Sequence, residues 1–517
     1  MYSRPEGDAG GMEHAMKASN DTETISYKKF REIATSHNGP AYIPVSREIP
    51  LPQSSPATIY AAMSEEQGFL LESMEGIPKR AVRSIIGIKP LATLAFSDKF
   101  RISGDCRRSF QIIENELENE ASALNALQQF CCSIACYAPD SCSFSGGMAG
   151  YCRYDLVNEI SGGMVRAESE DGPKIRFMIP GELIVFDHIR NTCTLIAGNL
   201  VNPGDELTEL YDNAIQRLNT LEKCTQVKEV QLECPVMTGN SNLLPDADRS
   251  EYEKSVKQAQ EYIRAGDIFQ VVLSRRFSVN YQEDPFRIYQ ILRTINPSPY
   301  LYYFNFGDEA VIGSSPEMLV KTEGTTVTTV PIAGTRPRGK TDQEDEELAA
   351  ELLADPKERA EHLMLVDLAR NDIGKVSKFG SVRVSEFMTV EKFSHVQHIT
   401  SVVNGNLQQG LHPIDALKAC FPAGTVSGAP KIRAMQIIEE LEPVARGLYS
   451  GAVGYLGFDN QMEFAIAIRT VMVKDGLATC QAGAGIVADS VPSREFNETQ
   501  AKVSAMAQAV FCAGGQA

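Results

Sequence analysis

Apolar and polar positions follow two periods along this chain, and the period in each stretch predicts either a helix or a strand. Residues 248–266 carry apolar side chains at helical spacing behind an aspartate or serine cap and end in a glycine. Residues 268–277, I-F-Q-V-V-L-S-R-R-F, are rich in β-branched and aromatic side chains and predict a strand. Further strands are predicted at 300–306, 319–321, 325–330, 381–389, 395–404, 452–458, 462–470 and 478–482, and further helices at 344–353, 357–370, 413–419, 430–442 and 494–510.

Runs of strands that look antiparallel, interrupted by helices, are typical of the α+β class. We therefore predict large antiparallel β-sheets packed as a sandwich, with helices outside and an active-site cleft between the two halves. Residues 109–136 and 206–223 predict helices in the first half of the chain. The expected domains are a loose tail at 1–24, an N-terminal domain at 25–230, a polar linker at 231–248 and a second domain at 249–512.

Composition narrows the function. The chain has 517 residues, with Lys+Arg 49 against Asp+Glu 67 and a net charge of −18, which argues against nucleic acid and anionic membranes as partners. None of the 12 cysteines forms a C-x-x-C pair, so reduced thiols are expected instead of zinc or disulfides. The N-terminus lacks an apolar signal region and no run approaches 18 apolar residues, so we expect a cytoplasmic protein without membrane spans.

Paired acids begin one predicted helix. A basic turn, P-I-A-G-T-R-P-R-G (331–339), precedes a helix that is capped by Asp355 and predicted to end at a left-handed Gly374. Glu358 and Glu361 are spaced i,i+3 on its apolar stripe, where acids are costly unless a cation meets them. The alternative is a solvated first turn, where acids suit the helix dipole.

A second predicted helix repeats this arrangement. Ser493 is the expected cap, and Glu495, Glu498 and Lys502 share one face at i, i+3 and i+7. Two helices that each offer paired carboxylates suggest a hard divalent cation, because Mg²⁺ takes one or two protein carboxylates and completes its shell with water and substrate oxygens. Two exposed helix starts remain the alternative.

Donors for an anionic ligand are spread over the second half. In F-S-H-V-Q-H (393–398) the two histidines face opposite sides of a strand, so at most one faces a given site. The glycine turn at Gly334 brings Arg336 and Arg338 close to backbone donors, and the turns at 424–431 and 482–490 offer backbone N–H groups to anionic oxygens. Arg469 ends an apolar strand, and an arginine buried there pairs with an acid or a ligand carboxylate. These donors, with a metal, fit a small substrate with more than one carboxylate.

The motifs P-I-A-G-T-R-P-R, E-R-A-E-H-L-M-L-V-D-L-A-R-N-D, F-S-H-V-Q-H, G-T-V-S-G-A-P-K, A-I-A-I-R-T and E-F-N-E-T-Q-A-K resemble those of the chorismate-utilising enzymes, and among them the anthranilate synthase component I family. The resemblance spans about residues 70–502. It implies that Mg²⁺ binds to Glu361 and Glu498, with Glu495 nearby. It implies catalytic roles for His395, Glu358 and Thr425. The residues implied for chorismate binding are Gly334, Thr335, Tyr449, Arg469, Gly483, Ala484, Gly485 and Lys502.

Two positions separate the members of this family. Members that add water use a lysine as its base on the strand that here carries Gln270, and para-aminating members use a lysine nucleophile where this chain has Ala333. Ortho amination is therefore expected: chorismate plus ammonia gives anthranilate and pyruvate, the first committed step of L-tryptophan biosynthesis. The alternatives are an aminodeoxychorismate synthase component I or a non-catalytic regulatory paralogue.

The resemblance also implies partners. No glutaminase-type cysteine motif occurs in the second half, so ammonia would come from a separate glutamine amidotransferase subunit, component II, in a heterotetramer. L-L-E-S at Leu70–Ser73 and N-P-S-P-Y at Asn296–Tyr300 resemble the family's tryptophan feedback pocket. The residues implied for tryptophan binding are Ser73, Pro299, Tyr300 and Leu301.

Overall fold

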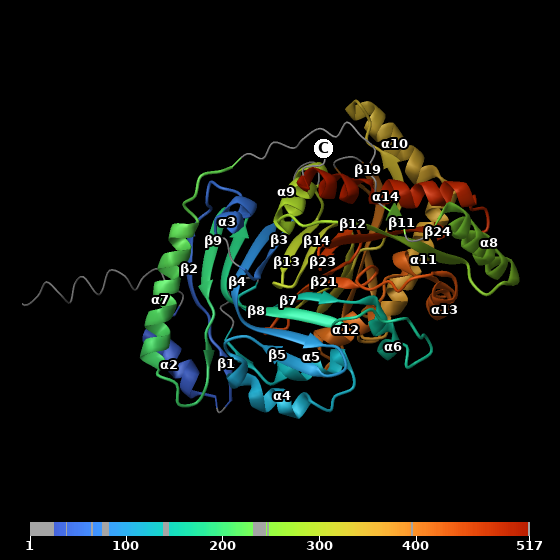
Figure 1. The fold of residues 1–517 in the computed structure, drawn as a ribbon. Helices are drawn as coiled ribbons and strands as arrows, with labels where there is room; N and C mark the ends of the chain where they lie inside the picture. Colours follow the sequence, from blue (N-terminus) through green and yellow to red (C-terminus); the bar gives the residue numbers. More distant parts are fainter. Residues whose placement is uncertain are drawn as a thin grey trace, which may run out of the picture.

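The computed structural model describes residues 25–37, 39–63, 66–74, 82–137, 144–230, 244–245, 248–393 and 396–514. The predicted tail at 1–24, most of the predicted linker at 231–248, and His395 lie outside these residues. Within them the fold is α+β with a large antiparallel sheet, as predicted (Figure 1).

One continuous path of antiparallel strand pairs runs through the molecule and organises it. In order of pairing, its strands are β12 (Gln270–Asn280), β24 (Leu477–Ile486), β23 (Thr470–Lys474), β14 (Glu309–Ser315), β13 (Tyr300–Asn305), β3 (Gly68–Glu72), β4 (Arg83–Phe96), β8 (Ile175–Asp187), β7 (Gly147–Cys152), β21 (Ala452–Gly457), β22 (Met462–Ile466), β15 (Met318–Glu323), β16 (Thr326–Thr329) and β19 (Val396–Asn406). β17 (Ile332–Pro337) and β18 (Arg383–Lys392) both pair with β19. The β13–β3 and β21–β7 pairs join residues on either side of the predicted linker by backbone hydrogen bonds.

Helices cover the outside of this path. The helices after residue 248 are α8 (Arg249–Ala265), α9 (Pro285–Ile295), α10 (Asp342–Ala354), α11 (Pro356–Gly374), α12 (Pro413–Cys420), α13 (Lys431–Leu441) and α14 (Pro492–Ala513), with the short turn η3 (Gly424–Val426). The earlier ones are α2 (Tyr27–Thr35), α3 (Pro56–Met63), η1 (Arg107–Phe110), α4 (Gln111–Leu117), α5 (Ala123–Cys132), η2 (Tyr154–Leu156), α6 (Val157–Ile160) and α7 (Leu207–Cys224). The remaining strands are β1 (Ala41–Tyr42), β2 (Val45–Pro50), β5 (Phe100–Ser103), β6 (Ala135–Cys136), β9 (Thr192–Ala197), β10 (Leu200–Val201), β11 (Leu244–Pro245) and β20 (Gly428–Ala429).

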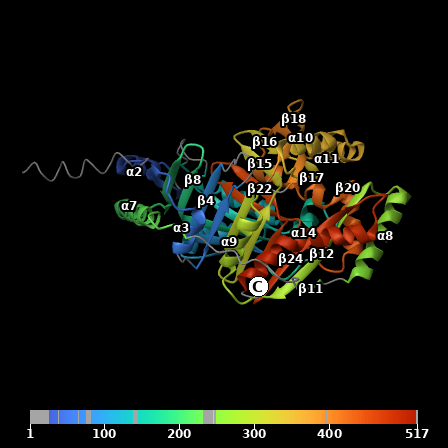
Figure 2. The same ribbon diagram turned by 90° about the horizontal axis from the view of Figure 1, so that it is seen from above.

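The two ends of the strand path lie on opposite sides of the site described below. Figure 2 shows α10, α11, β17 and β18 on one side and α8, α14, β12 and β24 on the other. Val256 of α8 and Ile437 of α13 belong to the same buried cluster as Leu273 of β12 and Ala484 of β24. Burying each large aliphatic side chain contributes about 1.5–3 kcal/mol, so this cluster fixes the β12–β24 pair on its helices.

Several local predictions were wrong. Gly374 is the last residue of α11, as predicted, but it does not take a left-handed conformation: Lys375 follows it in right-handed geometry and donates its N–H to Asp372 O. Ser493 is not the cap of α14, which begins at Pro492 without a side-chain cap. The predicted turn at 331–339 contains strand β17.

Three further elements also differ from the prediction. The helix expected at 109–136 is broken into η1, α4 and α5. The strand expected at 462–470 divides into β22 and β23, and β14 was not predicted at all. The cysteines among the described residues are free thiols, as predicted.

Candidate active site

Glu361 of α11 marks the point where three elements meet. Burial raises the pKa of its carboxyl, and the negative charges of Glu358 and Glu498 raise it further, while a hydrogen bond from the Gln270 side chain acts in the opposite direction. Glu358 lies on α11 itself, Glu498 on α14 and Gln270 at the start of β12. The charge of Glu498 on α14 therefore acts on Glu361 of α11, beside the first residue of β12.

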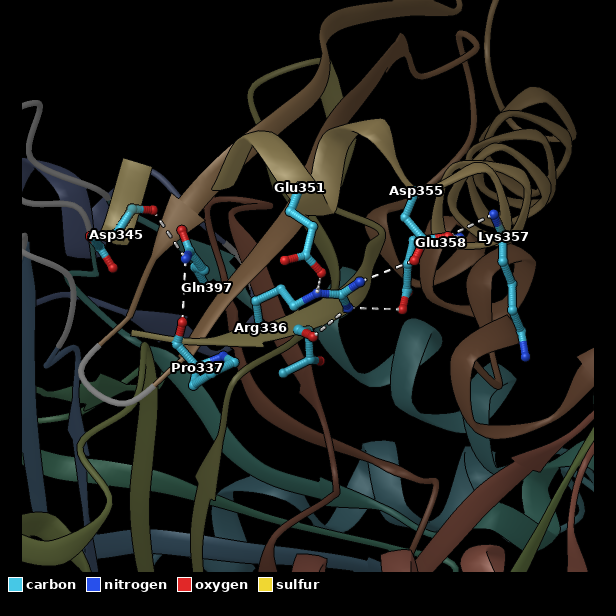
Figure 3. Close-up of polar contacts among 9 residues, drawn as sticks. Arg336, Pro337, Asp345, Glu351, Asp355, Lys357, Glu358 and Gln397 are labelled. Carbon is cyan, nitrogen blue, oxygen red and sulfur yellow. Dashed lines mark hydrogen bonds and ion pairs between the residues drawn. The ribbon is translucent and has the colours of Figure 1, made fainter. Parts of the chain in front are cut away.

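The basic turn holds the start of α11 in place. Asp355 caps the helix by accepting the N–H groups of Lys357 at 2.9 Å and Glu358 at 3.3 Å. Arg336 bonds to the carboxylates of Asp355 and Glu358 at 3.0 and 3.3 Å, and to Glu351 on α10 at 3.1 Å (Figure 3). Its guanidinium therefore fixes the helix start through ion pairs within the protein.

Arg338 likewise pairs within the protein. It forms two parallel bonds of 2.8 Å to the carboxylate of Asp345, with its Nη1 donated to Phe393 O at 2.7 Å. The Arg338 guanidinium, foremost among its neighbours, lowers the pKa of the Asp345 carboxyl. Both arginines of the turn thus hold it in place through ion pairs with acids of the protein.

Gly334 lies in a bulge of β17 and adopts φ +66°, which favours glycine. A Cβ on it would lie 3.0 Å from Glu358 Oε2, so glycine also leaves room for that carboxylate. Its carbonyl is 2.8 Å from His398 Nδ1, and Thr335 Oγ1 is 3.1 Å from the same nitrogen. Because the carbonyl can only accept, Nδ1 carries the proton and donates it.

His398 is the histidine that the structure places beside the predicted Gly334 and Thr335. Burial lowers the pKa of this imidazole; the Gly334 carbonyl opposes the shift and the charge of Arg469 adds to it. The ring is therefore neutral near pH 7. The prediction for His395 is untested, because that residue lies outside the described part of the chain. At most one histidine of the motif was expected to face the site.

The glycine-rich strand lies against β12. Gly483, Ala484 and Gly485 pair with Ser274, Leu273 and Val272. This register aligns the end of β24 with the first half of β12.

Side chains approach that strand closely. A Cβ on Gly483 would lie 2.7 Å from the hydroxyl of Tyr449, and a Cβ on Gly485 would lie 2.7 Å from Gln270 Nε2. Burial raises the pKa of Tyr449 to about 12, so its hydroxyl stays protonated and can donate. Lys502 donates to Gly483 O at 2.9 Å and pairs with Glu498 at 2.7 Å.

A buried acid that the motifs did not single out completes the site. Thr425 Oγ1 donates to Glu317 Oε1 at 2.7 Å. Burial raises the pKa of Glu317 to about 7, with the Thr425 hydrogen bond and the charge of Lys502 opposing the shift. In the sequence, Glu317 is the acid of S-S-P-E, between two predicted apolar strands. An acid in that setting is the sequence signal that could have identified Glu317 as a candidate site residue.

Arg469 is held in a strained backbone conformation. Its φ is +50°, in the left-handed region where a non-glycine residue costs of order 1–3 kcal/mol. Ser314 N–H donates to its carbonyl at 3.1 Å, and its charge acts on His398. Arg469 therefore lies in the connection between β22 and β23, and not at the end of a regular strand as predicted.

The acids of α11 and α14 are the candidate ligands for a divalent cation. Burial first, and then the charges of Glu358 and Glu498, raise the pKa of Glu361, and burial and Glu498 raise that of Glu495. Neighbouring carboxylates whose charges repel one another would be stabilised by a bound cation. Within the described ranges no group of three or more His, Cys, Asp or Glu side chains is arranged to hold a metal. A pair of hard oxygen donors nevertheless fits Mg²⁺, which needs one or two protein carboxylates.

The four residues predicted for feedback line one cavity of about 270 Å³. Ser73, Pro299, Tyr300 and Leu301 meet there because β3 pairs with β13, and Met74 N–H donates to Ser298 O at 3.1 Å. Residues of β4, β15, β21 and β22 also line the cavity. The acids of α11 and α14 are not among its lining residues.

In the described part of the chain, no helix has the length and apolar character needed to cross a bilayer.

Comparison with known proteins gives a consistent result. A family model described as chorismate binding enzyme matches residues 69–508. Anthranilate synthase component 1 of Acetivibrio thermocellus is 42% identical over 481 residues, covering 91% of this chain and 96% of that protein. The protein of the same name from Thermus thermophilus is 43% identical over 460 residues, covering 88% and 95%.

Solved structures show the same fold. Anthranilate synthase component I from Streptococcus pneumoniae superposes with a TM-score of 0.70 at 37% identity, covering 83% of this chain and 92% of that one. The menaquinone-specific isochorismate synthase of Escherichia coli superposes with a TM-score of 0.67 at 19% identity, covering 94% and 98%, which is a likeness of fold alone.

Proposed function

The chain belongs to the family of chorismate binding enzymes, and we propose that it is the chorismate-binding component of an anthranilate synthase. It converts chorismate and ammonia to anthranilate, pyruvate and water, the entry step of L-tryptophan biosynthesis. The observation that carries this conclusion is the identity of 42% over nine-tenths of the chain to anthranilate synthase component 1. The site agrees with it, because acids and cationic donors converge there as a substrate with two carboxylates requires.

Two sets of groups bind the two carboxylates of chorismate. Glu361 and Glu498 would hold Mg²⁺, with Glu495 and Glu358 close by, and the bound ion would supply electrophilic help to the ring carboxylate. The hydroxyl of Tyr449, the guanidinium of Arg469 and the backbone N–H groups of residues 483–485 supply hydrogen bonds to the second carboxylate.

Proton transfer is assigned to Glu317. Departure of the C4 hydroxyl needs a proton so that the oxygen leaves as water. A carboxyl with a pKa of about 7 is half protonated at neutral pH, whereas His398 is neutral and a weaker acid. We therefore assign the acid to Glu317, oriented by Thr425, and a positioning role to His398 at Gly334. Loss of the C2 proton and cleavage of the C3–O bond then release pyruvate and leave the aromatic amine.

Two residues favour ortho amination over the alternatives. Gln270 bonds to Glu361, so this position supplies an amide and no base for water. Ala333 is buried in β17 beside Gly334 and offers no nucleophile, which argues against a para-aminating aminodeoxychorismate synthase. The intact acids and Arg469 argue against a non-catalytic paralogue.

Ammonia, feedback and location complete the proposal. A separate glutamine amidotransferase subunit supplies ammonia within a heterotetramer, and the relatives' designation as component 1 supports such a second component. Tryptophan binds the cavity at Ser73 and Tyr300 and inhibits the reaction from there. The complex works in the cytoplasm.

The test uses the purified chain with chorismate, Mg²⁺ and ammonium at raised pH. Anthranilate is followed by its fluorescence, and the chain contains no tryptophan that would contribute emission. A product that needs a separate lyase to yield an aminobenzoate would overturn ortho amination. No turnover with either ammonium or an amidotransferase subunit would favour the non-catalytic paralogue.

A further inference from the structure

A buried ion pair, Arg446 with Glu442, lies beneath the residues that bind chorismate and takes no part in the proposed reaction. Arg446 Nε and Nη2 donate to the two oxygens of Glu442 at 2.8 and 2.7 Å. Their side chains are 1% and 6% exposed. Removing both charges from water costs about as much as their attraction returns, so such a pair contributes little net stability.

The remaining bonds of Arg446 all reach segments that carry site residues. Nη1 donates to Val426 O at 2.7 Å, one residue beyond Thr425, and to Ser450 Oγ at 3.0 Å, one residue beyond Tyr449. Nη2 also donates to Val272 O at 2.7 Å on β12. One guanidinium therefore joins the η3 turn, the Tyr449 segment and the first half of β12.

Glu442 extends the connection to the glycine-rich strand. Its Oε1 accepts the N–H of Ser274 at 2.7 Å and the Ser274 hydroxyl at 2.8 Å. Ser274 is the strand partner of Gly483, and Val272 is the partner of Gly485. The pair thus bonds directly to the backbone opposite both glycines.

We propose that Arg446 and Glu442 form a positioning pair, which holds the Thr425 turn and the Tyr449–Gly483 wall of the chorismate site at a fixed separation. The planar fork of arginine donates at once to a carboxylate, two carbonyls and a hydroxyl, which the three N–H groups of a lysine on a flexible stem cannot do. Without the pair, Thr425 shifts from Glu317 and Tyr449 shifts from Gly483. This inference rests on the proposed function for its readout, since both walls are assigned to chorismate.

The test compares three variants in the full-length chain. Arg446→Lys keeps the charge and loses the fork. Glu442→Leu/Arg446→Met replaces the pair by apolar side chains of similar size, a change that often leaves stability unaltered. Arg176→Lys is the control, because Arg176 pairs with Glu309 at 3.0 Å, with side chains 15% and 1% exposed, on strands outside the site.

Both variants of the pair are expected to lose about 100-fold in kcat/KM for chorismate, the loss typical of a misplacement near 1 Å. Displacement of Thr425 should lower kcat and displacement of Tyr449 should raise KM, whereas Arg176→Lys should leave both constants unchanged. The pH profile gives a second readout. Since the Thr425 bond lowers the pKa of Glu317, its loss should move the basic limb of kcat to higher pH.

The outcomes separate the two proposals. Anthranilate formation by the unaltered chain tests the function alone. If that holds, a folded apolar double variant with unchanged kcat/KM and an unmoved pH profile overturns the positioning role. If Arg446→Lys fails to fold, the double variant decides the matter. If Arg176→Lys loses activity to the same degree, the effect is general destabilisation and the proposal is also overturned.

Discussion

Replacing Glu317 by glutamine should stabilise the protein at alkaline pH while removing most of its activity. Glutamine keeps an oxygen that accepts from Thr425 Oγ1, now 2.7 Å from Glu317 Oε1, and it cannot ionise. In the unaltered chain, burial raises the pKa of Glu317 from an ordinary 4.5 to about 7. The folded state therefore holds this proton more tightly than the unfolded state does.

The sign and size of the effect follow from linkage. A raised acid pKa contributes stability that is fully present below pH 4.5 and is lost as pH rises to about 7. Each difference of one in pKa corresponds to about 1.4 kcal/mol, so the loss is about 3 kcal/mol. Unfolding entropy of about 2.1 cal/mol/K per residue gives about 1.1 kcal/mol/K for 517 residues. The loss is thus about 3 °C in Tm.

Calorimetric melting of both proteins at pH 4.5 and pH 8 measures this difference. The Tm of Glu317→Gln minus that of the unaltered chain should rise by about 3 °C between the two pH values. Its kcat should fall by about 10²–10⁴, the range for a lost general acid, and should lose the decline above pH 7, measured at constant free ammonia. An unchanged Tm difference would refute the raised pKa, and retained kcat would refute the acid role.

Two further predictions test the remaining assignments. Glu361→Gln or Glu498→Gln should raise the Mg²⁺ concentration for half-maximal turnover by about 10-fold or more, whereas Glu347→Gln on the exposed face of α10 should not; equal Mg²⁺ dependence in all three would reject the metal assignment. Ser73→Phe places a ring in the cavity of about 270 Å³, so the tryptophan concentration for half-inhibition should rise while kcat is retained, and an unchanged inhibition curve would contradict the proposed feedback site.

Sequence patterns were most informative where local chemistry decides the structure. Asp248 caps α8 with its side chain, and Gly266 ends it at φ +84°, as the cap signals predicted. Those signals act within one turn and need no tertiary information. Gly374 and Ser493 show the limit: α11 ends at Gly374 without a left-handed conformation, and α14 begins one residue before Ser493.

Sequence spacing grouped several of the proposed site residues, but it did not predict the bonds between them. Spacing alone paired Glu358 with Glu361 and placed Glu498 on a second acidic helix. Spacing could not show that Arg336 pairs with acids of two helices. Those ion pairs depend on where α10 and α11 pack relative to β17. Glu317 was missed for a related reason. Its raised pKa comes from burial by the fold, and no residue beside it in the sequence produces that effect.

The proposed feedback cavity is connected to the active site by the strands that line it. β13, which lines it, leads through β14 and β23 to β24 on one side of the active site. β22, which also lines it, leads through β15 and β16 to β19 on the other side. A ligand that changes the angle between these strands would alter the separation of the two ends of the path, where Glu361 meets Glu498. A ligand couples two sites only if it binds one arrangement of the protein more tightly than another. Tryptophan would therefore bind more tightly to one of two arrangements of the strands between the cavity and the active site.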